Sequence, residues 1–348
     1  MNSTQQQGLF EDTESLADEV QSAEVQSAKA PSSRKPSTIL PVAPSLENIQ
    51  LGARMHSQLH LGTSSWSFPG WNGLVYDGDF RDAQLARDGL PAYAAHPLFG
   101  CVGIDRTFYA PIAEADYRKY AGQVGEDFRF LVKAPMAITS SYLRDENGNF
   151  SDSPYFLDVG YAVNEFIAPC TAGLESKAGP LVFQFPPLGR AVREPDVFIN
   201  RLYRFLKALP TGPLYAVEMR DPELLTHRFF MCLKTTGVRF CVASHARMPS
   251  PRRQIALAEA VLDAGAFVAR WSLHSGFRYE DAKSRYFPFN KLVDEDLDSR
   301  DGLAEASAKA LEAGFPVYIV INNKAEGSAP LSIAMLAHRI DGLIQHTA

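Results

Sequence analysis

Several apolar segments of this sequence end in side chains that could take part in a reaction. Two carboxylates, Asp105 and Glu218, and the amine of Lys133 occupy such positions. Two carboxyl groups can act as acid and base when their surroundings separate their pKa values. Lys133 could lower the pKa of either carboxyl group or serve as a nucleophile. We therefore expect Asp105, Lys133 and Glu218 to be the catalytic residues.

Arginine side chains at similar positions indicate an anionic substrate. Arg220 and Arg270 suit the bidentate capture of a carboxylate or a phosphate. The segment 323–329 runs into an expected helix near Pro330, and free backbone N–H groups there would also attract an anion. The residues expected to bind the substrate are Trp66, Tyr109, Gln184, Arg220, Arg270, His274, Asn322 and Asn323.

The spacing of potential ligands does not indicate a metal or a cofactor. The four cysteines form no C-x-x-C pair and have no histidine cluster near them, which argues against zinc. Asp105, Glu218 and His274 form an alternative set of ligands for a divalent metal, but no spacing signature supports it. No G-x-S-x-G motif predicts a serine nucleophile. We therefore expect no metal and no cofactor.

These residues need a scaffold that brings distant segments together. Short β-branched or aromatic runs alternate with longer segments of helical periodicity, which indicates a parallel α/β sheet. Eight repeats favour a closed (β/α)8 barrel, and the missing G-x-G-x-x-G fingerprint argues against the alternative, an open doubly wound sheet. The expected strands are 59–64, 102–109, 128–133, 181–185, 214–220, 238–243, 267–271 and 317–322. The expected helices are 112–124, 197–209, 222–236, 254–264, 303–313 and 331–344.

The alternation of side chains along a strand predicts which of them face the barrel interior. In the segment 102–109 the interior set is Gly103, Asp105, Thr107 and Tyr109, whereas Phe108 points outward. Polar interior residues near the ends of the other strands are Lys133, Gln184, Glu218, Arg220, Arg270 and Asn322. Active sites of such barrels lie at the carboxyl ends of the strands, so we expect one shared polar pocket there.

Composition limits the classes of protein to which this chain can belong. Of 348 residues, 46% are hydrophobic and 21% charged, as in a globular protein, and the net charge of −6 gives no general attraction to nucleic acid or anionic membranes. Residues 1–55 are rich in Ser, Gln, Glu and Pro and predict a disordered tail. Residues 56–348 predict a single barrel domain. We expect a cytoplasmic protein without membrane contact, and the oligomeric state stays open.

Several motifs in these strands resemble those of a known family, the domain of unknown function 72 or YecE-like barrels. They follow in order over residues 59–345 and read LGTSSW at 61–66, VGIDRTFY at 102–109, FRFLVKAP at 128–135, QFPP at 184–187, VEMR at 217–220 and VYIVINN at 317–323. The resemblance implies a TIM-like barrel whose activity is not established. Four features depart from the pattern, because Asp105 replaces Glu, Ser140 replaces His, His245 stands where Asp is common, and 145–154 forms an extended loop rich in Gly and Asn.

Three functions fit these observations. The first is an enzyme of the hydrolase, lyase or isomerase type, acting on a small phosphate- or carboxylate-bearing substrate by acid–base chemistry. The second is a barrel that binds or processes nucleic acid, in which exposed Trp66, Phe68 and Trp71 would stack on bases. The third is a non-catalytic barrel that only binds its ligand. The polar mouth favours the first, and nucleic acid is not favoured.

Overall fold

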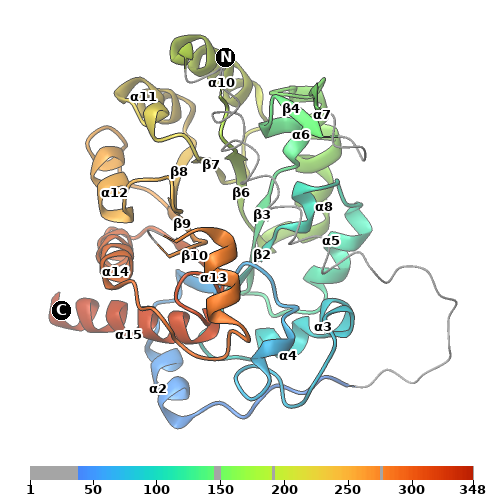
Figure 1. Ribbon diagram of the computed structural model, residues 1–348, viewed down its shortest axis with the longest axis vertical. Helices are drawn as coiled ribbons and strands as arrows, with labels where there is room; N and C mark the ends of the chain where they lie inside the picture. Colours follow the sequence, from blue (N-terminus) through green and yellow to red (C-terminus); the bar gives the residue numbers. More distant parts are fainter. Residues whose placement is uncertain (1–37, 145–149, 190–192, 275–276, 348) are drawn as a thin grey trace, which may run out of the picture.

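The computed structural model describes residues 38–144, 150–189, 193–274 and 277–347, and within them eight parallel strands close into a barrel (Figure 1). Around the barrel the strand order is β1-β10-β9-β8-β7-β6-β3-β2. The strands are β1 (Leu59–Thr63), β2 (Cys101–Ile104), β3 (Arg129–Lys133), β6 (Ala178–Phe185), β7 (Tyr215–Met219), β8 (Arg239–Ser244), β9 (Phe267–Trp271) and β10 (Val317–Ile321). The expected closed barrel is therefore confirmed.

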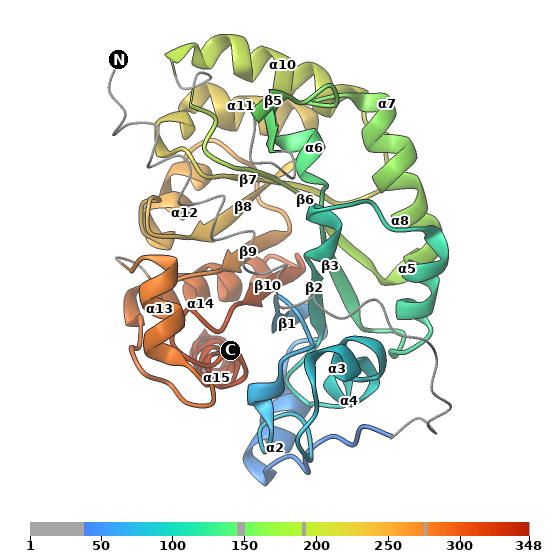
Figure 2. The ribbon, with the colours of Figure 1, turned by 45° about the vertical axis from the view of Figure 1, so that its right-hand side comes forward.

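Helices connect successive strands and cover the outside of the barrel (Figure 2). The longer ones are α2 (Leu46–Arg54), α5 (Glu114–Ala121), α10 (Pro195–Ala208), α11 (His227–Thr236), α12 (Pro251–Glu259), α13 (Tyr279–Tyr286), α14 (Leu297–Glu312) and α15 (Ala329–Thr347). The shorter ones are α3 (Asp82–Asp88), α4 (Leu90–Ala94), α6 (Met136–Thr139), α7 (Val159–Tyr161) and α8 (Ala168–Leu174). No helix of the described chain is long and apolar enough to cross a membrane.

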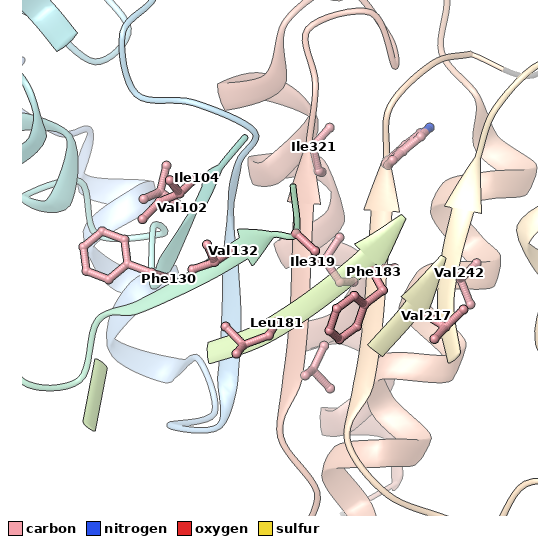
Figure 3. Packing of buried hydrophobic residues seen from close by; sticks show 14 of the residues in the cluster. Val102, Ile104, Phe130, Val132, Leu181, Phe183, Val217, Val242, Ile319 and Ile321 are labelled. Carbon is pink, nitrogen blue, oxygen red and sulfur yellow. The ribbon is translucent and has the colours of Figure 1, made fainter. Parts of the chain in front are cut away.

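The two faces of the strands carry different side chains, as their alternation predicts. Residues such as Val102, Phe130 and Phe183 point outward and pack in the layer between strands and helices (Figure 3). The interior of the barrel is a separate, smaller apolar cluster that consists of Cys101, Leu131, Val182, Ala216, Cys241, Val268, Tyr318 and Val320. This interior cluster fills the barrel below its carboxyl-terminal mouth, so polar residues at the ends of the strands lie on an apolar floor.

The second strand is shorter than expected. It ends at Ile104, and the 3-10 helix η2 (Arg106–Phe108) follows Asp105. The alternation that we expected to continue to Tyr109 is therefore wrong beyond Ile104. The hydroxyl of Thr107 stabilises this turn, because its one proton lies between the carbonyl oxygens of Ile104 (3.0 Å from Oγ1) and Lys133 (2.5 Å).

Residues 38–55 are ordered, which corrects the expected disordered tail in this segment. They contain α2, whose first turn is capped by the Ser45 hydroxyl accepting a hydrogen bond from the backbone N–H of Asn48. Leu51 is fully buried, and Arg54 forms an ion pair with Asp341 of α15. Ile39 is also buried, and the backbone N–H of Val42 donates to the carbonyl oxygen of Val75. Buried apolar side chains, a helix cap and backbone hydrogen bonds thus outweigh a composition that is typical of disorder. The rest of the expected tail, 1–37, lies outside the described residues.

The mouth of the barrel carries an added hairpin. The expected extended loop at 145–154 lies partly outside the described residues, but its flanks form antiparallel strands β4 (Tyr142–Arg144) and β5 (Phe150–Asp152). This hairpin follows α6 and so belongs to the connection after β3, whose last residue is Lys133.

The side chain of Gln254 forms hydrogen bonds with the backbone of β8 where β7 does not pair with it. The two strands share only the backbone pairs Ala216–Arg239 and Val217–Phe240. Farther along β8, the amide of Gln254 on α12 accepts a hydrogen bond from the N–H of Ala243 (3.1 Å) and donates one to its carbonyl oxygen (2.7 Å). The Gln254 amide therefore replaces a neighbouring strand at this point.

Candidate functional site

A buried carboxylate lies at the centre of the polar mouth. Glu218, near the end of β7, is fully buried, and its two oxygens bind different arginines. Arg220 Nε donates to Oε1 (2.6 Å), and Arg270 Nη1 donates to Oε2 (2.8 Å). Burial acts to raise the pKa of Glu218, but the charges of Arg220 and Arg270 outweigh it and lower this pKa to about 2. Glu218 is therefore ionised throughout the physiological range of pH.

Arg270, on β9, links Glu218 to side chains at the ends of two other strands, β6 and β2. From β9 its Nη1 also donates to Oε1 of Gln184 on β6 (3.2 Å), and its Nη2 donates to Oδ2 of Asp105 after β2 (2.7 Å). Burial acts to lower the pKa of Arg270, but Asp105 and Glu218 raise it far above its ordinary value. One guanidinium thus holds both predicted carboxylates of the site in place across the barrel.

Lys133 lies beside this network. Its side chain is buried, and Nζ lies 3.5 Å from the centre of the Phe108 ring. Its positive charge also helps to lower the pKa of Glu218. The expectation that Phe108 points outward is wrong, because the turn of η2 brings this ring over the Lys133 ammonium.

His245, directly after β8, is a further half-buried polar group near Glu218 and Arg220 that the strand pattern did not indicate. Burial, and then the charge of Arg220, lower the pKa of His245 to about 3, so its ring is neutral at physiological pH. Nδ1 accepts a hydrogen bond from the N–H of Arg247 (3.4 Å), which leaves the ring proton to Nε2. The only available signal was position: His245 directly follows an expected strand, at the end where this fold carries its sites.

The structure gives several expected binding residues structural contacts instead. Trp66 is buried and donates from Nε1 to the carbonyl oxygen of Leu85 (3.1 Å). Trp71 is also buried and donates to Oδ1 of Asn323 (3.0 Å). The expectation that both tryptophans are exposed is therefore wrong. Each fills a gap between connecting segments, where its indole N–H finds a protein acceptor.

The remaining expected binding residues lie at the edge of the mouth. Asn322 is half-buried and donates from Nδ2 to the hydroxyl of Ser64 (2.9 Å). Tyr109 is 38% exposed, and its ring packs edge-on against Phe108. His274 is half-buried, and its ring packs edge-on against Phe277.

The start of α15 is not open to an anion. Asn323 Oδ1 accepts a hydrogen bond from the N–H of Ala329 (2.9 Å), and residues 323–330 are all buried. The carboxylate of Glu326 occupies this region and forms an ion pair with Arg300 (2.6 Å). The expectation of free N–H groups near Pro330 is therefore wrong, because the chain's own side chains enclose and cap this helix end.

The candidate site thus consists of Asp105, Lys133, Gln184, Glu218, Arg220 and Arg270. In the part of the chain that the structure describes, no three His, Cys, Asp or Glu side chains are grouped so as to hold a metal ion. The alternative metal set of Asp105, Glu218 and His274 is not assembled there. Both carboxylates are instead bound by guanidinium groups.

Comparison with known proteins identifies the family of this barrel. A family model described as "protein of unknown function DUF72" matches residues 60–347. The chain belongs to the DUF72 family. The family resemblance drawn from the strand motifs is thereby confirmed.

Solved structures of DUF72 proteins share the barrel. A DUF72 protein of Enterococcus faecalis is 19% identical, with a TM-score of 0.55, over 82% of this chain and 95% of its own. One of Thermotoga maritima is 18% identical, with a TM-score of 0.53, over 82% of this chain and 99% of its own. At these identities the likeness shows the fold alone. No curated protein matches the chain.

Proposed function

We propose that this DUF72 barrel is an enzyme that binds a small phosphate- or carboxylate-bearing substrate at its mouth. The observation that carries this proposal is the balance of charge around Glu218. Three cationic side chains, Lys133, Arg220 and Arg270, all act on the buried carboxylate of Glu218, and Arg270 also pairs with Asp105. An anion that reaches this concentration of positive charge would accept charge-assisted hydrogen bonds from it.

We propose different roles for the two carboxylates. Glu218 is enclosed and permanently ionised, so it suits the orientation of the two guanidinium groups better than proton transfer. The side chain of Asp105 is 20% exposed as a whole, and its Oδ1 is a buried oxygen without a hydrogen-bond partner within the described chain, so this oxygen is left for a bound group to engage. We therefore assign proton transfer to Asp105, and to Lys133 a contribution to the charge that holds the substrate.

Binding of inorganic phosphate at constant ionic strength tests the anion site. At ten times its dissociation constant, phosphate should stabilise the protein by about 1.4 kcal/mol. For a barrel of this size that corresponds to a rise in Tm of about 2 °C. Arg220→Gln should reduce this rise, because it removes one guanidinium. Arg118→Gln, on the outer helix α5, should not change it.

The same variants separate a site from a structural network. If wild type does not respond to phosphate, or if both variants respond as wild type does, the mouth binds no anion and its charges only plug the barrel. Turnover is tested by screening phosphorylated and carboxylated small molecules by NMR with wild type and Asp105→Asn. Binding without any turnover would assign the non-catalytic barrel instead.

The alternative of a nucleic-acid barrel has lost its main support. It depended on exposed Trp66 and Trp71 beside the arginines, and both tryptophans are buried in contacts with the protein. A salt-dependent gel shift with single-stranded DNA or RNA would restore this alternative.

A further inference from the structure

An exposed aromatic ring lies beside the cationic group of the mouth. Lys133 Nζ contacts the face of Phe108, and the Phe108 ring meets Tyr109 edge-on with 5.5 Å between the ring centres. Tyr109 is 38% exposed, whereas Phe108 and Lys133 are buried. The Lys133 ammonium group, the Phe108 ring and the Tyr109 ring are therefore in contact in series, and the last of them is exposed to solvent.

The backbone holds Tyr109 firmly in this place. The N–H of Phe108 donates to the carbonyl oxygen of Asp105 (3.0 Å), and that of Tyr109 donates to Arg106 (3.2 Å). The Thr107 hydroxyl, shared between the carbonyl oxygens of Ile104 and Lys133, attaches the same turn to β3. Asp105 and Tyr109 are thus the two ends of one short hydrogen-bonded turn.

Exposed aromatic rings of the described chain gather in the connections that follow the strands. Tyr142 and Tyr155 belong to the connection after β3, and Phe287 to the connection after β9. Tyr203, on the outer helix α10, is the exception. The connections after strands form the mouth of the barrel, which is the face that carries the cationic group.

We propose that Tyr109 forms a ring-binding subsite next to the anion site, and that the ligand is a phosphate or carboxylate attached to a sugar or base ring. This inference rests on the proposed function, since the anion must first be held by the arginines. An exposed tyrosine ring can stack on a nucleobase or on the apolar face of a sugar. A single exposed ring on this turn fits one ring of a small ligand.

Calorimetric titration with three probes tests this subsite. The probes are inorganic phosphate, ribose 5-phosphate and adenosine 5′-monophosphate, which carry no ring, a sugar ring, and a sugar with a base. We expect at least one ring-bearing probe to bind roughly 5- to 30-fold more tightly than phosphate. A gain already present in the sugar phosphate identifies the sugar as the stacked ring, and a gain confined to the nucleotide identifies the base.

Variants connect that gain to Tyr109. Tyr109→Leu should abolish the gain from the ring and leave the affinity for inorganic phosphate unchanged, whereas Tyr109→Phe should keep the gain. Tyr203→Leu removes a similarly exposed ring from the outer face and should change neither quantity. Circular dichroism would verify that each variant is folded.

The outcomes separate this inference from the proposed function. If wild type binds all three probes equally, or if Tyr109→Leu weakens phosphate and nucleotide to the same extent, the ring-binding subsite is refuted while the anion site stands. If wild type binds none of the probes, both proposals fail.

Discussion

Replacing Glu218 by glutamine would test whether one buried carboxylate holds the two arginines of the mouth. Glutamine keeps the shape and one acceptor oxygen but removes the charge that Arg220 and Arg270 share. A pKa lowered from the ordinary 4.5 to about 2 corresponds to about 3 kcal/mol, at 1.36 kcal/mol per pKa unit. Removal of one partner of a buried ion pair costs a similar amount, about 3–5 kcal/mol.

The sign of the pH dependence follows from the lowered pKa. The folded state holds the proton of Glu218 less tightly than the unfolded state, so the stabilisation is fully present above pH 5. It disappears as the pH falls from about 4.5 toward 2. Glu218→Gln should therefore be about 3 kcal/mol less stable than wild type at pH 7, and the difference should shrink steadily in acid.

Urea unfolding at pH 7, 5, 4 and 3 measures this difference. Glu114→Gln is a matched control, because Glu114 pairs with Arg118 on the exposed surface of α5 and should contribute less than about 0.5 kcal/mol. A difference between wild type and Glu218→Gln that stays the same from pH 7 to pH 3 would refute the reasoning. It would mean that packing, and not the charge of Glu218, accounts for the loss.

Two further predictions concern the scaffold. Leu51→Ala should lower the free energy of unfolding by about 3 kcal/mol in urea titrations, because Leu51 is fully buried. Leu46→Ala, at an exposed position of the same helix, should have little effect. Equal effects of the two substitutions would mean that α2 does not pack on the barrel. Gly62→Ala would place a Cβ atom 1.9 Å from the carbonyl oxygen of Cys101 on β2, so it should lower Tm by several degrees. Gly125→Ala has open space around the added Cβ atom and should not lower Tm. An unchanged Tm for Gly62→Ala would contradict the close approach of β1 and β2.

The sequence predicts the barrel and the core of its site because both depend on local patterns. Apolar runs with period two mark the strands, and the same period places Glu218, Arg220 and Arg270 on the interior face. Polar residues at the carboxyl ends of barrel strands must then meet at one mouth. Glu218 and the two arginines carry opposite charges, so their ion pairs can be predicted once the strand faces that point into the barrel are known.

Other features depend on information that no local pattern contains. The change from strand to turn after Ile104 reverses the side of Phe108, but no glycine or proline at residues 105–108 marks the end of the strand in the sequence. The partner of Trp71 is Asn323, 252 residues away, so its burial leaves no trace nearby. His245 follows β8 in a polar run, where no period indicates an orientation.

The amide of Gln254 makes the backbone hydrogen bonding of β8 depend in part on a helix. Where adjacent strands pair directly, separating them breaks a ladder of backbone hydrogen bonds. Beyond the two backbone pairs of β7 and β8, the N–H and the carbonyl oxygen of Ala243 are bound by a side chain on α12. The backbone groups of Ala243 therefore remain paired without β7, whose end carries Glu218 and Arg220. Their pairing depends instead on the position of α12, so a substitution on this helix would act directly on the hydrogen bonding of the barrel wall.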